Sequence, residues 1–241
     1  LPNTRRARTV RLSLLGLALG GAIVGGIALA GPLNPPAGPV TSTYKTLTEV
    51  EPRIAINATN TPGDADSLFK ITQPGSYYLT GNITGVVGKH GIELAASGVT
   101  LDLSGFDLVG VPGSLDGASA TVGVNNVTVR HGSLRSWGDE GLDFTNGSSI
   151  VVEGVSVLTC AGFGISVNTN STVSHCRVSS NGAGGIATGS NCLVTGCAAH
   201  GNTGAGGILA FVGCRVVDCA AFANTGNGIS AQNGSTITGC S

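Results

Sequence analysis

The chain has 241 residues, of which 40 are Gly and 10% are charged, with a formal net charge of −1. A hydrophobic content of 41% excludes an intrinsically disordered chain, because disorder requires few apolar residues and a high net charge. We expect no nucleic-acid partner, since that function needs a basic patch or stripe and this charge balance gives no sign of one.

The first thirty residues are predicted to be an export signal. Four arginines precede an apolar run over 12–30, which closes with Ala28-Leu29-Ala30, the pattern of a secretory signal peptide. The alternative for residues 1–30 is an uncleaved membrane anchor, because the run is just long enough to span a bilayer. In both cases we expect the rest of the protein to be extracellular, at the cell surface or periplasmic. Contact with a membrane is expected through this segment alone, if it stays uncleaved.

Two short segments precede the main part of the chain. Residues 31–43 are rich in Pro and are predicted to form a linker. Residues 44–85 carry more charge, and Pro74-Gly75 is a turn signal between two strand-like runs. This segment is predicted to be an N-terminal β cap.

Residues 86–241 repeat one pattern at steps of 21 to 26 residues. A column of mostly branched aliphatic residues comprises Leu103, Val129, Val152, Val173, Val194, Val216 and Ile237. A second column, three residues later, comprises Phe106, Gly132, Val155, Cys176, Cys197, Cys219 and Cys240. A third column, in which Gly precedes each member, comprises Leu142, Ile165, Ile186, Ile208 and Ile229. Repeats of this length predict a solenoid.

The composition of the repeats selects the kind of solenoid. Leucine-rich repeats need a leucine-dense consensus, and helical repeats need longer periods. Here each unit holds short β-branched runs, such as residues 127–129 and 236–238, that are broken by Gly and Asn, which indicates strands and turns. We therefore predict an all-β parallel β-helix, whose coils stack about 4.8 Å apart. Stacked Asn side chains in a further column (Asn181, Asn202, Asn224) would bond to each other and to the turns.

These repeats resemble a known family. Each stretch from a stacked Asn through a Gly-rich turn to Gly-Ile, as in residues 224–229, is similar to the repeats of right-handed parallel β-helix proteins. That family includes the pectate-lyase-like superfamily and many exported bacterial repeat proteins. The resemblance implies the right-handed sense of the coil. It leaves function open, because one fold hosts many activities.

The seven cysteines follow the repeat. Four share the second column, Cys192 and Cys214 share another, and Cys160 falls in the Asn column. Stacking makes the Cβ vectors of neighbouring cysteines parallel, which strains a disulfide. A straight ladder also lacks the tetrahedral geometry of a zinc site. We predict buried thiols that pack as small apolar groups, with no metal site.

Charged residues gather in one place. From residue 155 onward the charged side chains are Arg177, Arg215 and Asp218, too few for a catalytic set. Residues 129–143 are denser and, with the next coil, supply the candidates. The catalytic candidates are Arg135, Asp139, Glu140 and Asp143, and the ligand-binding candidates are Arg130, Trp137 and Glu153, with Trp137 stacking on a sugar. The alternative is a solvated turn. His90, in contrast, shows no partner in the sequence.

Three functions are compatible with these observations. The first is an exported rigid rod with a structural or binding role at the cell surface or envelope, with polysaccharide as the expected partner. The second is a polysaccharide lyase or glycoside hydrolase acting on an acidic polysaccharide. The family resemblance implies calcium for a lyase, whereas a glycosidase needs two carboxylates facing one bond. The third is metal handling by the cysteine column. No cofactor is expected for the rod.

The C-terminal end gives one more expectation. The sequence stops at Ser241, directly after a cysteine of the repeat. We expect further coils to follow, and the unpaired edge of the last coil would favour stacking against another chain.

Overall fold

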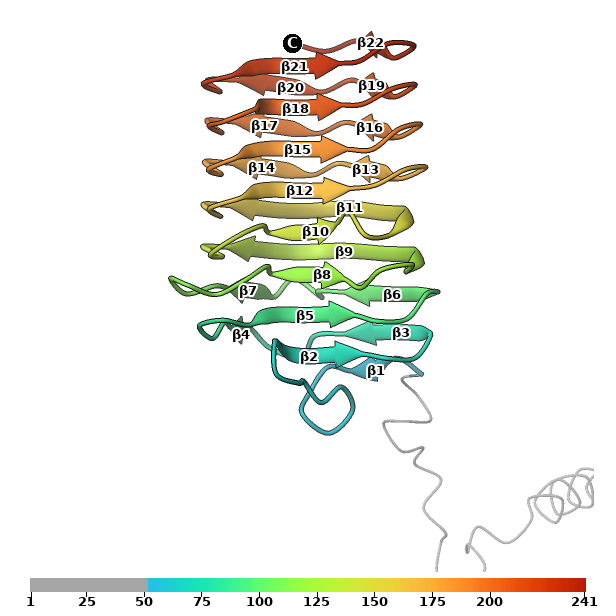
Figure 1. Ribbon diagram of the computed structural model, residues 1–241, viewed down its shortest axis with the longest axis vertical. Coiled ribbons are helices and arrows are strands. Elements are labelled where there is room, and N and C mark those ends of the chain that lie inside the picture. The colour runs from blue at the N-terminus through green and yellow to red at the C-terminus, as the bar shows by residue number, and fades with distance from the viewer. Residues whose placement is uncertain (1–51) are drawn as a thin grey trace, which may run out of the picture. The chain divides into compact units, whose positions relative to one another are not determined.

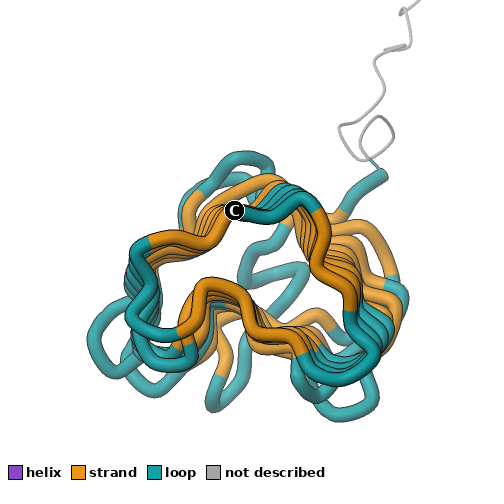
Figure 2. Tube along the Cα trace, turned by 90° about the horizontal axis from the view of Figure 1, so that it is seen from above, coloured by secondary structure: helices purple, strands orange, loops and turns teal. Residues whose placement is uncertain are grey.

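The computed structural model describes residues 52–241, which form a single-chain solenoid of stacked coils (Figure 1). Seen along its axis, each coil has three sides, and a short strand lies on each side (Figure 2). All named strands pair in parallel with the equivalent strand of the next coil. The predicted parallel β-helix is therefore confirmed. The predicted signal segment, the linker and the first residues of the predicted cap lie outside the described residues.

The first and second faces of the solenoid belong to one 14-stranded sheet, because β9 (Asn125–Arg135) and β11 (Ser148–Leu158) bend from one face to the other. The remaining strands of the first face are β1 (Ile54–Ala55), β3 (Gly75–Tyr78), β6 (Val99–Asp102), β13 (Thr172–Ser174), β16 (Leu193–Thr195), β19 (Arg215–Val217) and β22 (Thr236–Thr238). Those of the second face are β4 (Ile83–Thr84), β7 (Asp107–Val109), β14 (Arg177–Ser179), β17 (Ala198–His200) and β20 (Ala220–Phe222).

The third face is a separate 8-stranded sheet, one strand for each coil. Its strands are β2 (Ser67–Ile71), β5 (His90–Leu94), β8 (Ala118–Ala120), β10 (Leu142–Phe144), β12 (Phe163–Val167), β15 (Gly184–Thr188), β18 (Gly206–Ala210) and β21 (Asn227–Ala231). The strands β2, β3 and β4 already pair in parallel with β5, β6 and β7. Coil stacking thus begins within the segment that the sequence assigns to a cap.

The register confirms most of the predicted columns. Leu142, Ile165, Ile186, Ile208 and Ile229 pair in succession, and so do Val129, Val152, Val173, Val194, Val216 and Ile237. One assignment is wrong, because Val129 pairs with Leu101 rather than with Leu103. Leu103 instead lies below Gly132 at the next corner, where it is fully buried. The coil that contains Leu103 has two more residues at this corner than the coil above it. Counting along the sequence therefore misaligns the column by two positions.

Every corner turns through a residue with left-handed backbone, with φ between 52° and 74° in the coils from Asn126 onward. The next residue points inward. The left-handed residues are His131, Gly154, His175, Gly196, Asp218 and Gly239 at the first corner; Ser136, Thr159, Ser180, Gly201 and Ala223 at the second; and Asn126, Ser149, Asn170, Asn191, Gly213 and Gly234 at the third. Among the described residues, twelve non-Gly residues adopt positive φ, although it costs an L-residue about 1–2 kcal/mol.

Inward side chains at the corners form hydrogen-bonded ladders. At the second corner, Oδ1 of Asn181 accepts from the backbone N–H of Cys160 (3.0 Å), and its Nδ2 donates to the carbonyl of Val157 (3.4 Å). At the first corner the thiol of Cys197 makes the same two contacts, with the N–H of Cys176 and the carbonyl of Val173, both at 3.5 Å. In these coils the turn leaves an N–H and a carbonyl pointing inward, and the side chain above satisfies both.

The third corner shows that the chemical group can vary. The thiol of Cys214 contacts the N–H of Cys192 and the carbonyl of Gly189, at 3.4 and 3.1 Å. One coil later, the hydroxyl of Ser235 contacts the N–H of Cys214 and the carbonyl of Phe211, at 3.0 and 2.7 Å. Cys, Asn and Ser recur at the corners because each can accept and donate at once. The thiols are aligned and unpaired as predicted, but they also form hydrogen bonds.

The interior is otherwise apolar and is filled by Val, Ile, Leu and Ala in register, with 0–5% exposure for most of them. Within residues 52–241, no helix is long and apolar enough to cross a bilayer.

Candidate functional site

The outer surface of the third face carries the main concentration of charge. In one column Ser67 lies beside His90, followed in the next coils by Asp116, Glu140 and Phe163. In the adjacent column the register runs through Lys70, Glu93, Ser119, Asp143 and Ser166. Consecutive coils therefore place acidic and basic side chains next to one another on a flat sheet, although they lie 20 to 30 residues apart in sequence.

A shallow hollow of about 300 Å³ lies among these columns. We call it the acidic hollow. It forms because Ser119 is short and stands between the longer side chains of Glu93 and Asp143. Its lining residues are His90, Glu93, Asp116, Ser119, Ala120, Thr121, Val122, Asp143 and Asn146.

Asp116 is held in place by neighbours on both sides. Its Oδ2 lies 3.1 Å from Nδ1 of His90, and its Oδ1 accepts a hydrogen bond from the backbone N–H of Glu140 at 2.9 Å. The Asp116 carboxylate raises the pKa of His90, which favours the imidazolium form. In the neutral ring the same Nδ1 accepts from the backbone N–H of Asp116, 3.2 Å away. The pair thus keeps its geometry in both protonation states.

Glu140 differs from the neighbouring acids in having a strongly raised carboxyl pKa. Burial raises the pKa of its carboxyl to about 8, and the negative charges of Asp143, Asp116 and Asp139 act in the same direction. Its Oε2 atom is buried without a hydrogen-bond partner, while the hydroxyl of Ser166 lies against the carboxyl and opposes the shift. At neutral pH this group is mainly a neutral hydrogen-bond donor.

Two other carboxylates flank Glu140. Oδ1 of Asp143 accepts from the backbone N–H and the hydroxyl of Thr145, at 2.9 and 2.6 Å, which fixes its orientation. Partial burial raises the pKa of Asp139, and the charges of Asp116 and Asp143 add to the effect. The predicted acids Asp139, Glu140 and Asp143 therefore do lie together, and the structure adds Asp116, Glu93 and His90 to them.

The other predicted site residues lie elsewhere. Arg130 and its neighbour Glu153 are on the first face, where Nε of Arg130 is 3.2 Å from Oδ2 of Asp102. Arg135 is on the second face, with Nε 3.5 Å from Oδ2 of Asp107. Residues 129–143 therefore do not form one continuous patch, because this stretch runs through parts of all three faces of a coil.

Trp137 also has a different role from the predicted one. It occupies the Asn column, but its side chain is buried, with 1% exposure, and its Nε1 donates to the carbonyl of Leu108 at 3.1 Å. Glycines provide the room for the indole, since a Cβ on Gly85, Gly91 or Gly117 would lie about 3 Å from it. The indole therefore fills the core of the wide N-terminal coils and has no face free to stack on a sugar.

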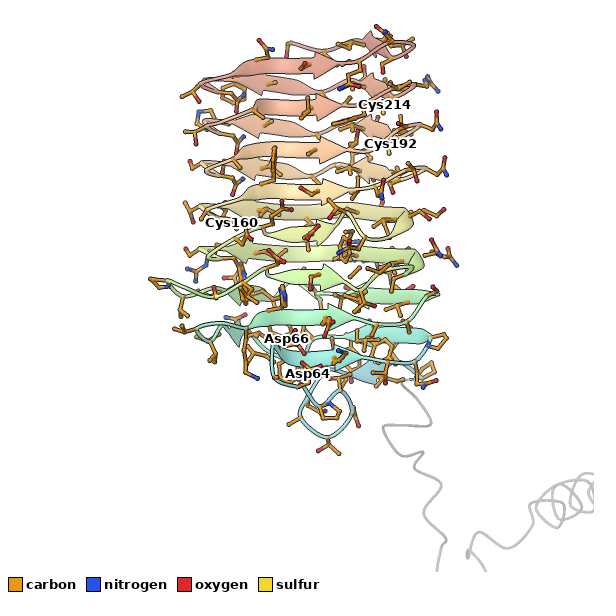
Figure 3. The ribbon with its side chains drawn as sticks, viewed as in Figure 1. Asp64, Asp66, Cys160, Cys192 and Cys214 are labelled. Atoms are coloured by element: carbon orange, nitrogen blue, oxygen red, sulfur yellow. The ribbon has the colours of Figure 1, made fainter. Side chains whose placement is uncertain are left out.

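An acidic triad at the lower end of the third face could suggest a cation site. Carboxylate oxygens of Asp64, Asp66 and Glu93 lie within 4.8 Å of one another, and Figure 3 labels the two aspartates beside β2. However, Nζ of Lys70 is 2.7 Å from both Asp64 and Glu93. Asp64, followed by Glu93, raises the pKa of Lys70, so the ammonium group already supplies the positive charge. This triad does not fit calcium, and we assign it no catalytic step.

His90, Glu93 and Asp116 were missed because the Gly-Ile column was traced from Leu142 onward. Extending it downward gives Ala118 and then Ile92, each preceded by Gly. That extension places His90 and Asp116 directly below Glu140. The signal was present in the sequence, but the larger spacing of the early coils concealed it.

Three faces of parallel strands, ladders at the corners of the later coils and a continuous apolar interior define a parallel β-helix. A family model described as the right-handed beta helix region matches residues 110–241, more than half of the chain, and the protein belongs to this family. No curated protein matches the chain.

Proposed function

We propose that the protein is an exported, rigid β-helical rod that binds a neutral glycan on its third face. The observation that supports this most directly is the acidic hollow, where His90, Glu93, Asp116, Ser119 and Asp143 converge on one shallow depression. Small-molecule sites combine a depression with a few well-placed polar groups, and these side chains fit that description.

The chemistry of the hollow favours a ligand with hydrogen-bond donors. Ionised Asp and Glu can only accept hydrogen bonds, so a partner rich in hydroxyl groups matches them. Asp116 and Asp143 are each held by two hydrogen bonds or ion pairs, so little side-chain freedom is lost on binding. A polysaccharide with carboxylate groups would be repelled unless a cation bridged the charges.

The rest of the chain supports a rod outside the cytoplasm. The basic and apolar pattern of residues 1–30 is that of an export signal. Parallel strand pairing joins each coil of the third face to the next, and corner ladders reinforce the later coils, so the third face is a fixed platform.

A carbohydrate-binding assay tests this proposal. Calorimetric titrations would compare soluble neutral β-glucan and xylan with pectin and alginate, the latter two with and without calcium. We expect binding to a neutral polymer, and a loss of at least tenfold in affinity for the double variant Asp116→Asn, Asp143→Asn. Glu153→Gln, an exposed acid on the first face, is the matched control and should bind as the parent does. Failure to bind any neutral polymer would overturn the proposal.

A second candidate function, glycoside hydrolysis, uses the same surface. Glu140 is a carboxyl kept mainly protonated at neutral pH beside the carboxyl groups of Asp116 and Asp143. A glycosidase requires such a pair, one acid to protonate the leaving oxygen and one carboxylate to act as base or nucleophile. Release of reducing ends from the same polymers, abolished by Glu140→Gln, would establish it. A complete panel without product would exclude it.

A further inference from the structure

A second hollow lies on the third face, above the acidic one. Its volume is about 330 Å³, and its lining residues are Thr145, Ser166, Val167, Asn168, Thr169, Ala187, Thr188, Gly189, Ser190 and Phe211. The two hollows are adjacent, because Asn146 lines the acidic hollow and Thr145 lines this one. We call it the neutral hollow, since none of its lining residues is charged.

The sequence builds this hollow by alternating small and large residues in two columns. Ser166 and Ala187 form the floor, as successive outward residues of β12 and β15. At the edge, Asn168, Gly189 and Phe211 occupy equivalent positions in three consecutive coils. Gly189 carries no side chain, so no side chain of its coil stands between Asn168 in the coil below and Phe211 in the coil above. A Cβ at Gly189 would lie 2.7 Å from Oδ1 of Asn168, so the close packing requires glycine.

The walls of the hollow present two kinds of surface. Phe211 is 41% exposed, whereas most large apolar side chains of the described residues are buried. Asn168 is fixed opposite it, because its Nδ2 donates to the carbonyl of Thr145 at 2.7 Å and its Oδ1 accepts from the N–H of Thr169 at 2.8 Å. An exposed aromatic ring beside hydroxyl and amide groups, without charges, suits a ligand that is apolar on one side and hydroxylated at its edges.

We propose that the neutral hollow is a second sugar-binding subsite, with Phe211 stacking on a pyranose ring, and that one linear neutral glycan lies along the rod axis across both hollows. This inference rests on the proposed glycan binding and extends it to a polymer of defined direction. The outward column from Glu93 to Leu209 advances five coils. The combined surface is therefore about 24 Å long, enough for several sugar units in an extended chain.

Ligands of two different lengths distinguish binding at a single hollow from binding across both hollows. Calorimetric titrations with neutral β-glucan oligosaccharides of two and six units would be made with the parent protein and three variants. Phe211→Ala removes the stacking ring, and Ala187→Arg fills the floor from an outward position. Phe222→Ala is the matched control, because Phe222 is also exposed, at 56%, but lies on the second face.

We expect the six-unit ligand to bind the parent at least tenfold more tightly than the two-unit ligand. Phe211→Ala and Ala187→Arg should remove that advantage, while Phe222→Ala should retain it. Unchanged hexamer binding in both hollow variants would overturn the inference. If the double variant at Asp116 and Asp143 still lost binding in that case, the proposed function would stand. Absence of binding by the parent to any neutral glycan would defeat both.

Discussion

The Oδ1 atom of Asn202 accepts two hydrogen bonds from Asn181, one from its backbone N–H at 3.1 Å and one from its side-chain amide at 3.0 Å. Both residues are fully buried. Nδ2 of Asn202 in turn donates to the carbonyl of Val178 at 3.2 Å. One side chain thus satisfies polar groups that a tight corner leaves inside an apolar interior.

Replacing Asn202 with Ala should be strongly destabilising. The variant leaves the N–H of Asn181 and the carbonyl of Val178 without partners, and each buried unsatisfied group costs about 1–3 kcal/mol. We expect a loss of about 2–4 kcal/mol in the free energy of unfolding, measured by urea denaturation. Asn82→Ala is the control, since Asn82 is exposed and accepts one hydrogen bond, from the N–H of Asp107. Equal losses in the two variants would contradict the role of the ladder.

Cys214 distinguishes hydrogen bonding from simple packing. Cys214→Ser keeps a group that can both accept from Cys192 and donate to Gly189, as Ser235 does one coil later. Cys214→Val keeps the volume and apolar character but loses both contacts. We expect the Ser variant to be more stable than the Val variant by about 1 kcal/mol in urea denaturation. If Val proved equal or better, the thiol would act as an apolar filler.

Glu140 should make stability fall as pH rises. The pKa is about 8 in the folded protein and near the ordinary value of 4.5 when unfolded, so between these values the folded state binds more protons. The free energy of unfolding therefore decreases from about pH 4.5 to about pH 8. Glu140→Gln removes this titration, and thermal unfolding from pH 5 to 8.5 should show a smaller decrease for the variant.

His90 also makes the free energy of unfolding decrease as pH rises. This contribution is present in both the parent and Glu140→Gln, so it cancels when the two are compared. Because Asp116 raises the pKa of His90, its stabilisation is present at low pH and is lost as pH rises through the folded pKa. The difference between parent and variant therefore reports on Glu140. Parallel curves for the two proteins would show that Glu140 is ionised throughout.

Ala223 should gain from substitution by Gly. It adopts φ of 55° at the second corner, where an L-residue is strained by about 1–2 kcal/mol and Gly is not. After subtraction of the greater entropy of Gly in the unfolded chain, we expect the free energy of unfolding to rise by up to about 1 kcal/mol. In contrast, Ala198→Gly lies within strand β17 and should lose about 0.5–1 kcal/mol. Two changes of the same sign would argue against corner strain.

The sequence was sufficient for the fold because stacking makes every coil repeat the same inward residues. The columns ending at Ile229 and Ile237 could be aligned by counting. Leu103 could not be aligned in this way. The extra corner residues of its coil change the distance to Val129 along the sequence, while both Leu101 and Leu103 are leucines and look equally suitable. Trp137 was misjudged for a related reason. Its position in the Asn column was visible, but the glycines that make room for its indole lie up to 52 residues earlier in the sequence.

The candidate site was predicted in part. Asp139, Glu140 and Asp143 are neighbours in sequence and remain neighbours on the third face. His90 and Asp116 come from earlier coils, and only the strand register places them next to Glu140 on the third face. Arg130 and Arg135 illustrate the opposite effect, because corners send nearby residues to different faces.

The corner ladders also bear on how such a chain can change in length. Among the later coils, each coil offers its upper neighbour an N–H and a carbonyl and supplies the bridging group to the coil below, as Asn181 does 21 residues after Cys160. A duplicated stretch of that period would meet the same partners on both sides. Growth by tandem duplication therefore needs no new interface, and the near-identity of the later coils is what such a history would leave behind.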